Sequence, residues 1–540
     1  MTKKTKLRVW LLLFAFAVLL SVPFLIPGSA PLALVSLVPL FLADKVLYDS
    51  GAKHCWLYFL AAFLAFNVAT TFWIWYVSQA GAVAAIFLNS LQMALVFGLF
   101  RWFRKVQDRI WPKSPRIIAY LFLTAAWLAW EHVYFNVEIS WPWLVLGNAF
   151  ATSTSIVQWY YVTGALGGTL WIFLTGIFVF LCITAGERRK ASVWMAVSVA
   201  TAILPIIVSL HMKRVDSMKK GSPCEVVVIQ PNIDPFSKYG ILPQARLDYR
   251  LMELAESYVS DSTRFVITPE TFTFDINIDN PSGNSSMMVY ADFFERHPNT
   301  EMLLGALTYR TYTSSIKPTR SARRIGNFWY DSFNTAMITD GKSISSHYFK
   351  SKLVPGVEII PYQNVLKFLG PLVAKFGGSS DSYGTQDEMD ALAGRNGDLK
   401  VGAMICYESI YGDYSRMATK KGANFLAVMT NDGWWGDTPG YRQHFRFARL
   451  RAIENRRYVV HAANTGISGV IDRQGNVLSS TRWWEETAFR SNIECFDDIT
   501  HFVKYGDVIG LSACRLFLLA LAVTVLSLFW GKRSLRGRSA

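Results

Sequence analysis

The stretch VGAMICYE, at residues 401–408, indicates how the second half of this 540-residue chain folds. Its apolar run is short and ends in polar residues, which is typical of a buried strand. Runs of the same kind occur at 224–230, 264–270, 302–309 and 425–432. Helical periodicity separates several of them, as at 243–259 and 438–454, and a strand, a turn and a hairpin follow at 458–478. Strands that alternate with helices predict an α/β layered domain.

Apolar residues crowd into the parts of the chain outside this domain. Hydrophobic residues make up 52% of the sequence and charged residues only 17%, which is too apolar for an ordinary soluble protein. Eight apolar runs have about the 20 residues that a membrane span needs. They lie at roughly 9–27, 30–48, 56–78, 82–100, 117–134, 155–182, 192–210 and 509–530. The sequence predicts a seven-span membrane domain at 1–212, the α/β domain at 213–504, and a C-terminal span with a basic tail at 505–540.

Lysines and arginines predict the orientation of these spans. If the N-terminus is cytoplasmic, the connections on that side carry 19 of them. The short connections on the other side, near 27–31, 79–82 and 135–154, carry none. This asymmetry follows the positive-inside rule and places residues 213–504 outside the cytoplasm.

The net charge of +15 does not indicate a nucleic-acid partner, because the excess cations accompany the apolar runs. Residues 213–504 carry 34 Lys and Arg against 32 Asp and Glu, and they show no basic stripe of the kind that binds nucleic acid. The six cysteines and eight histidines are scattered, without metal-ligand spacing. We therefore expect no nucleic acid, no metal and no cofactor.

Three residues at or near predicted strand ends could carry chemistry. Glu270 follows an apolar strand in TPET, Lys350 lies in YFKSKLVPGVEIIP, and Cys406 lies in GAMICYES. A carboxylate can take the proton of a thiol, and an ammonium can stabilise both the thiolate and the oxyanion of an attacked carbonyl. The backbone N–H of Tyr407 is a natural second oxyanion donor. Such a trio suits acyl transfer through a thioester.

Each of these residues also has an ordinary structural interpretation. A single cysteine at the end of a buried strand is usually a small core residue, and a loop lysine or glutamate is usually solvated. His444 suggests a cysteine–histidine pair, but packing or hydrogen bonding near the site is the favoured role. Cys224 and Cys495 either form a disulfide in an oxidising compartment or remain buried free thiols.

Seven sequence strings, in order, resemble the nitrilase superfamily, over about residues 223–495. With the flanking spans, nearly the whole chain is similar to the apolipoprotein N-acyltransferase family. The strings are IQPNI at 229–233, TPET at 268–271, YFKSKLVPGVEIIP at 348–361, ICYES at 405–409, TNDGWWG at 430–436, QHFRFARLRAIENRR at 443–457 and NTGISGVID at 464–472.

The resemblance implies a nitrilase-like sandwich fold and assigns roles to individual residues. Glu270 is the general base, Lys350 the cation on the oxyanion side, and Cys406 the nucleophile. Supporting roles fall to Glu358, Tyr407 and Glu408. Candidates for substrate binding are Tyr239, Trp434 and Trp435, and the two tryptophans either line an acyl pocket or pack the core.

The chain departs from the family pattern at three places. Tyr239 and Thr268 each stand where the family often has tryptophan. Gly356-Val357 replaces the usual Phe-Gly before the second glutamate, Glu358.

The activity that the resemblance implies is lipoprotein maturation in a bacterial inner membrane, with the catalytic domain in the periplasm. Cys406 takes an acyl chain from a membrane glycerophospholipid and passes it to the N-terminal amine of a diacylglyceryl-cysteine apolipoprotein. A membrane-tethered amidase or nitrilase would use the same triad but let water attack. A channel or transporter with a degenerate outer domain is disfavoured, because most spans lack charged residues.

Residues 364–376, NVLKFLGPLVAKF, have an apolar helical face interrupted by Gly370 and Pro371. They form either a helix packed on its own domain or a lid that enters the bilayer surface and admits acyl chains to Cys406.

Overall fold

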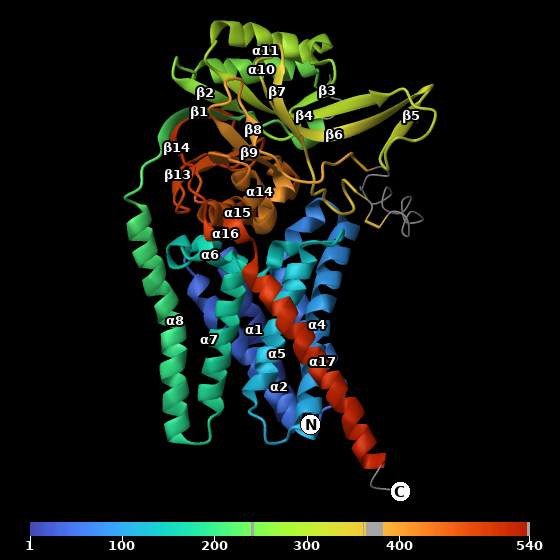
Figure 1. Cartoon of the computed structure of the whole chain (residues 1–540), viewed down its shortest axis with the longest axis vertical. Coiled ribbons are helices and arrows are strands. Elements are labelled where there is room, and N and C mark those ends of the chain that lie inside the picture. The colour runs from blue at the N-terminus through green and yellow to red at the C-terminus, as the bar shows by residue number, and fades with distance from the viewer. Residues whose placement is uncertain (239–241, 360, 363–381, 537–540) are drawn as a thin grey trace. The chain divides into compact units, whose positions relative to one another are not determined.

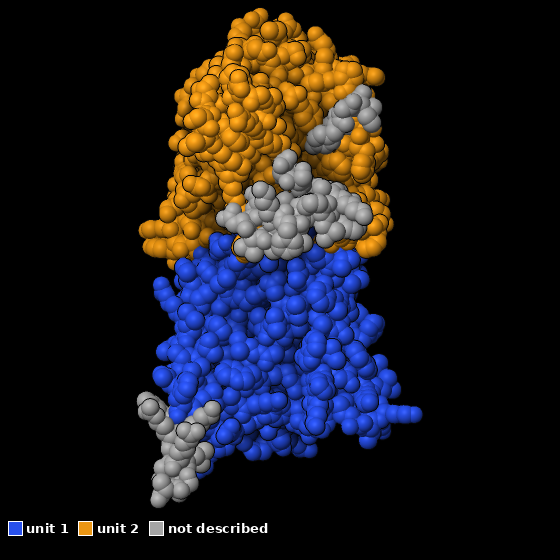
Figure 2. Space-filling view, turned by 90° about the vertical axis from the view of Figure 1, so that its right-hand side faces the viewer, with its two compact units in different colours: residues 1–72, 82–212, 507–540 blue, residues 73–81, 213–506 orange. Residues whose placement is uncertain are grey.

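The computed structural model describes residues 1–238, 242–359, 361–362 and 382–536. Contacts divide the chain into two compact units, which Figure 2 colours separately. The first unit consists of Met1–Phe72, Ala82–Met212 and Asp507–Ala540, and the second of Trp73–Gly81 and Lys213–Gly506. Tyr239 and residues 364–376, for which the sequence allows a packed helix or a lid, lie outside the described residues.

The first unit is helical, and eight helices in the described residues are long and apolar enough to cross a membrane. Their long helical segments are α1 (Lys3–Leu25), α2 (Ala33–Asp49), α3 (Trp56–Thr71), α4 (Gln79–Ile110), α5 (Ile117–Tyr134), α7 (Leu166–Thr184), α8 (Arg188–Asp216) and α17 (Val508–Arg536) (Figure 1). The predicted multi-span helical region is therefore confirmed.

The predicted start of the sixth span, at residue 155, is wrong, because α7 begins at Leu166. Gly164 has φ +63° and ends the short helix α6 (Tyr160–Thr163), which separates the apolar run into two pieces. The Tyr160 hydroxyl donates to the carbonyl of Gly147, and the N–H of Gln158 donates to the Ser209 hydroxyl. These bonds satisfy polar groups in buried irregular backbone.

Buried charges in the first unit have partners. Arg101 and Arg104 both bind the fully buried Asp44 carboxylate, Arg104 at 2.6 Å. Glu131 accepts hydrogen bonds from the indole N–H of Trp127 and the backbone N–H of Leu146. Such partners offset the free-energy cost of burying an acidic side chain away from water.

The second unit contains two β-sheets in its described part. The larger sheet has the order β14-β1-β2-β4-β6-β5, with β3 beside β4 and β7 beside β6. Its strands are β1 (Ser222–Gln230), β2 (Thr263–Ile267), β3 (Thr273–Asn277), β4 (Glu301–Tyr312), β5 (Arg323–Ile325), β6 (Phe328–Thr339), β7 (Ile344–Phe349) and β14 (Thr487–Cys495).

The smaller sheet has the order β13-β12-β11-β10-β9-β8. Its strands are β8 (Leu392–Ala393), β9 (Lys400–Ile405), β10 (Phe425–Thr430), β11 (Val459–Ala463), β12 (Gly469–Ile471) and β13 (Val477–Ser480). Strands β9, β10 and β11 run parallel, whereas β12 and β13 form an antiparallel hairpin.

Helices cover the outer faces of the two sheets. Helices α10 (Gln244–Glu256) and α11 (Ser285–Arg296) lie on the larger sheet, and α14 (Gly412–Lys420) and α15 (Pro439–Asn455) on the smaller one (Figure 1). Two short helices, α9 (Pro235–Lys238) and α16 (His501–Tyr505), complete the unit. The predicted α/β sandwich is confirmed.

Strand β1 shows why the sequence is continuously apolar there. Val226 and Val228 enter the core between the sheets, whereas Val227 and Ile229 enter the core under α10 and α11. All four are fully buried, and each such side chain stabilises the fold by about 1.5–3 kcal/mol.

The cysteines of β1 and its antiparallel neighbour β14 are not joined by a disulfide. Cys224 and Cys495 are both buried and both free. Of the two possibilities left open by the sequence, the structure has the pair of free thiols.

Candidate active site

The three predicted catalytic residues all follow strands of the second unit. Glu270 comes three residues after β2, Lys350 directly after β7, and Cys406 directly after β9. The predicted strands 264–270 and 401–408 are therefore a little too long at their C-terminal ends, because their last residues form turns. Polar residues at the carboxyl ends of such strands are where α/β sheets commonly bind ligands.

The Glu270 turn is fixed to β4 by backbone bonds. Thr268 donates its N–H to the carbonyl of Leu303 and accepts the N–H of Gly305 on its hydroxyl. Gly305 has to lack a side chain, because a Cβ atom there would lie 2.2 Å from the carbonyl oxygen of Pro269. Thr271, the next residue after Glu270, has φ +44°. Thr268, one of the departures from the family pattern, thus anchors the turn.

Lys350 is an almost fully buried ammonium between two carboxylates. Its Nζ lies 3.1 Å from Glu270 Oε1 and 2.9 Å from the carboxylate of Glu358. Burial alone would lower the pKa of Lys350, but Glu270, Glu358 and Cys406 together raise that pKa well above its usual value. The group is therefore a permanent cation at neutral pH.

Asn334, in the middle of β6, joins the same two carboxylates. Its side-chain N–H₂ donates to Glu270 Oε1 at 2.8 Å and to Glu358 Oε1 at 3.2 Å. Its backbone carbonyl accepts the N–H of Lys350. One residue therefore orients both carboxylates and the lysine.

The Glu358 turn is closed by bonds of its own. Glu358 accepts the N–H of Val354 on its carboxylate and donates its own N–H to the carbonyl of Val354. Gly356 has φ +78°, and its N–H bonds the carbonyl of Ile359. At the departure Gly356-Val357, glycine thus occupies a left-handed position that suits it.

Cys406 lies in a strained turn. It is partly buried and has φ +51°, which is uncommon for a residue other than glycine. Burial and the Glu270 carboxylate raise the pKa of its thiol well above the usual value, although Lys350 and the Thr430 side chain oppose the shift. The resting thiol is therefore protonated at neutral pH, and reaction at this sulfur requires a base.

Glu408 ties the loop of Lys350 to the turn of Cys406. Its fully buried carboxylate accepts the Tyr348 hydroxyl at 2.6 Å and the backbone N–H groups of Ser351 and Lys352. Its other oxygen accepts the N–H of Ile405, one residue before Cys406. Glu408 thus fixes the distance between the two loops without contacting the thiol.

Comparison with known proteins places this geometry in a family. The sequence profile of the carbon-nitrogen hydrolases matches residues 207–493, more than half of the chain. The chain belongs to the carbon-nitrogen hydrolase family. The profile of the apolipoprotein N-acyltransferase N-terminal domain matches residues 16–178 in addition.

Relatives match both parts of this carbon-nitrogen hydrolase. The apolipoprotein N-acyltransferase of Chlorobaculum tepidum is 28% identical over 89% of this chain and 89% of its own. That of Geobacter metallireducens is 26% identical over 93% of this chain and 92% of its own. The solved structure of Saccharomyces cerevisiae Nit3, of the nitrilase superfamily, covers 51% of this chain and 91% of its own, with 14% identity and a TM-score of 0.35. The family resemblance predicted from the sequence is confirmed.

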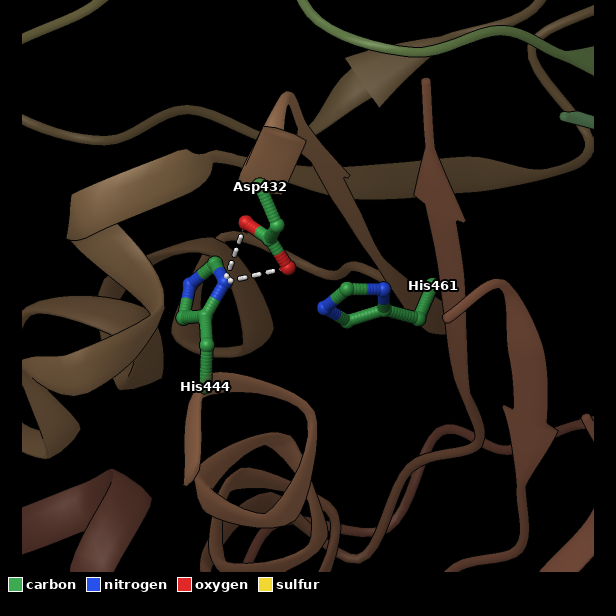
Figure 3. Close-up of side chains that lie close together, drawn as sticks. All are labelled: Asp432, His444 and His461. Carbon is green, nitrogen blue, oxygen red and sulfur yellow. Dashed lines mark hydrogen bonds and ion pairs between the residues drawn. The ribbon is translucent and has the colours of Figure 1, made fainter. Parts of the chain in front are cut away.

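A second polar cluster of this carbon-nitrogen hydrolase is made of Asp432, His444 and His461 (Figure 3). All three are fully buried, and one nitrogen or oxygen atom from each lies within 4.8 Å of those from the other two. The ring nitrogens of His444 and one oxygen of Asp432 are already used in hydrogen bonds. We therefore assign no metal to the cluster.

The predicted tryptophans are both half-buried. Trp434 packs edge-on against Phe236, and Trp435 packs against His444 and Trp73. A substrate-binding role stays a prediction for both, and Tyr239 lies outside the described residues.

Sequence reasoning missed several residues that hold the site, chiefly Asn334, Tyr348, Thr430 and Gly305. Asn334 could have been noticed, because asparagine is disfavoured within strands. Tyr348 and Thr430 open two of the quoted strings, but the strings do not show which residues they contact, and Gly305 lies in none of them.

Proposed function

We propose that this carbon-nitrogen hydrolase is an apolipoprotein N-acyltransferase. The observation that carries the proposal is the buried Lys350 between two carboxylates, beside a thiol that needs a base. The N-terminal domain profile and the names of the full-length relatives supply the acceptor class. A plain amidase would not require a membrane domain of this type.

In the first step, Glu270 takes the proton of Cys406, and the thiolate attacks the ester carbonyl of a glycerophospholipid. The oxyanion is stabilised by the Lys350 ammonium and the N–H of Tyr407. The carbon–oxygen bond then breaks, the acyl chain stays on sulfur as a thioester, and Glu270 returns the proton to the lysophospholipid.

In the second step, the N-terminal amine of a diacylglyceryl-cysteine apolipoprotein attacks the thioester. Glu270 takes a proton from the amine, and the carbon–sulfur bond breaks. An amide forms on the lipoprotein, and Glu270 passes its proton to the leaving sulfur, which restores the Cys406 thiol. Because both substrates are anchored in a membrane, lateral diffusion brings them to an enzyme that is anchored there too.

The proposal includes a place in the cell. Eight candidate spans and the cation asymmetry support a multi-pass protein of the bacterial inner membrane, with residues 1–212 and 505–540 as membrane parts and 213–504 in the periplasm. Reporter tags after residues 110 and 538 should be cytoplasmic, and a tag within 380–395 should be periplasmic. A cytoplasmic tag in 380–395 would contradict this arrangement.

The test of function is to incubate the purified enzyme with phospholipid and a diacylglyceryl lipoprotein. Mass spectrometry should show one added acyl chain on the amine and an equal amount of lysophospholipid. Release of ammonia from amides, without acyl transfer, would identify an amidase instead.

A further inference from the structure

The Asp432–His444 pair contacts the backbone of the nucleophile's turn. His444 lies on α15, and its Nδ1 is 3.0 Å and 3.3 Å from the two carboxylate oxygens of Asp432 (Figure 3). Its Nε2 is 3.1 Å from the carbonyl oxygen of Cys406 and 2.8 Å from the hydroxyl of Ser409. The pair therefore reaches the nucleophile without contacting its sulfur.

The available protons define what His444 does. The Cys406 carbonyl can only accept, and Ser409 donates its one hydroxyl proton to it at 2.9 Å. Nε2 must then be a donor toward this carbonyl and hydroxyl. Nδ1 faces the carboxylate of Asp432, which also accepts the hydroxyl of Thr430, so Nδ1 is a donor as well. A histidine that donates from both nitrogens is an imidazolium.

The surroundings agree with a charged His444. Burial alone would lower its pKa, but the Asp432 carboxylate, the Cys406 carbonyl and Glu270 raise it above the usual value. The neighbouring His461 has its pKa lowered to about 3 by burial and by His444, so it is neutral. Neither ring nitrogen of His461 makes a hydrogen bond of normal geometry to the described residues, although the ring faces the backbone of Ile467.

The carbonyl that His444 holds belongs to the same peptide group as the N–H of Tyr407. That group is planar and trans, so fixing the C=O direction fixes the N–H direction on its opposite side. Without restraint, the left-handed conformation of Cys406 would relax, since it costs about 1 kcal/mol or more. A cation on the carbonyl also polarises the peptide, which strengthens its N–H as a donor.

We infer that Asp432 and His444 are positioning residues that orient the Tyr407 N–H as the oxyanion donor, by holding the carbonyl of the Cys406–Tyr407 peptide. The inference rests on the proposed acyl transfer through Cys406. It gives His444 a role in stabilising the transition state without any proton transfer to or from the thiol.

The experiment compares three variants. His444→Phe keeps a ring but removes both donors. In His444→Gln, the amide N–H₂ can reach the acceptors of Nε2, but the charge is lost. His461→Phe is the matched control, because it alters an equally buried histidine of the same cluster that holds no carbonyl of the turn. Asp432→Asn serves as a second test if His444→Phe does not fold.

Two rates are measured on protein of equal folded fraction. One is Cys406 acylation, followed by intact mass, with phospholipid and separately with p-nitrophenyl butyrate. The other is alkylation of Cys406 by iodoacetamide, which needs the thiolate but no oxyanion donor. His444→Phe should lower acylation by about 10²-fold. His444→Gln should recover about tenfold of that loss. The alkylation rate of both His444 variants should stay within about threefold of the wild-type rate. Both rates of His461→Phe should also stay within about threefold of the wild type.

Several outcomes would overturn the inference. They are wild-type acylation in His444→Phe, no advantage of glutamine over phenylalanine, or an equal fall in alkylation and acylation. One equivalent of zinc in the purified wild-type enzyme would also reject it, because Nδ1 would then be a ligand. If only p-nitrophenyl butyrate acylates the wild type, the proposed function fails but the comparison of variants still tests the positioning role.

Discussion

Two buried clusters lie close to Cys406, one around Lys350 and one around His444. They differ in charge and in the groups that they bind. On the thiol side, Lys350 has two carboxylates and an amide around it, and in the proposed mechanism this cluster takes and returns the protons. On the backbone side, His444 has one carboxylate, and it holds a carbonyl. If the proposed mechanism holds, the cluster around Lys350 supplies the reacting groups, and the cluster around His444 supplies only their geometry. Substitutions on the first side should therefore cost more activity.

The largest effect is expected for Glu270→Gln. Loss of the base should lower thioester formation by up to about 10⁴-fold. Because the Glu270 carboxylate raises the pKa of Cys406, its removal should lower that pKa and leave alkylation at pH 7 equal or faster. Single-turnover acylation and iodoacetamide labelling measure the two rates. If both rates fell together, Glu270 would be holding the site together instead of moving protons.

Lys350→Met should lower acylation by about 10²–10³-fold, since the oxyanion loses a cation. It also leaves Glu270 and Glu358 buried without their counter-ion, which costs several kcal/mol of stability. The double variant Lys350→Met with Glu358→Gln separates the two effects. Thermal unfolding should show recovered stability while acylation stays low. Recovered acylation in the double variant would remove Lys350 from the chemistry.

Asn334→Ala should have a smaller effect, of about tenfold on acylation. Its amide orients two carboxylates, but Lys350 still binds both, so the base stays near its place. Loss of a hydrogen bond to a charged group costs about 1.5–3 kcal/mol, part of which appears as lost stability. The matched control is Asn284→Ala, which removes the cap of α11 far from Cys406 in sequence. An unchanged acylation rate in Asn334→Ala would show that Lys350 alone sets the geometry.

The smallest effect is expected for Ser409→Ala, on the backbone side. The variant removes one of the two donors to the Cys406 carbonyl, and His444 retains the other. A neutral hydrogen bond contributes about 1 kcal/mol, so acylation should fall less than about fivefold. A loss as large as that of Lys350→Met would contradict the division between the two sides.

Local patterns predicted much of this architecture. Runs such as 224–230 and 425–432 gave strands because residues buried on both faces must all be apolar. The end of β9 was predicted too late, at residue 408, because the apolar run does not show that a turn begins at Cys406. The start of α7 was predicted wrongly as well, because hydropathy cannot show that Gly164 takes a left-handed conformation.

The sequence predicts fewer of the site residues whose partners lie far away in the chain. Glu270 and Lys350 were found through their motifs, but the Asn334 amide that joins Glu270 to Glu358 comes from a strand without a motif. His444 was given the modest role of a neighbour. Its bond to a backbone carbonyl depends on a turn 38 residues away, which no local spacing reveals.

Residues 73–81 belong to the second unit, although they lie between segments of the helical first unit in the sequence, and this matters for expressing the second unit alone. Trp73 packs on Trp435, donates its indole N–H to Gln443, and covers Gly440, where a Cβ atom would lie 2.7 Å from its ring. A truncated gene that encodes only residues 213–506 would produce a fragment without α17 and without this tryptophan, and a hole would open beside Trp435 and Gly440. Residues 73–81, which include the first residues of α4, would have to be supplied in trans or grafted.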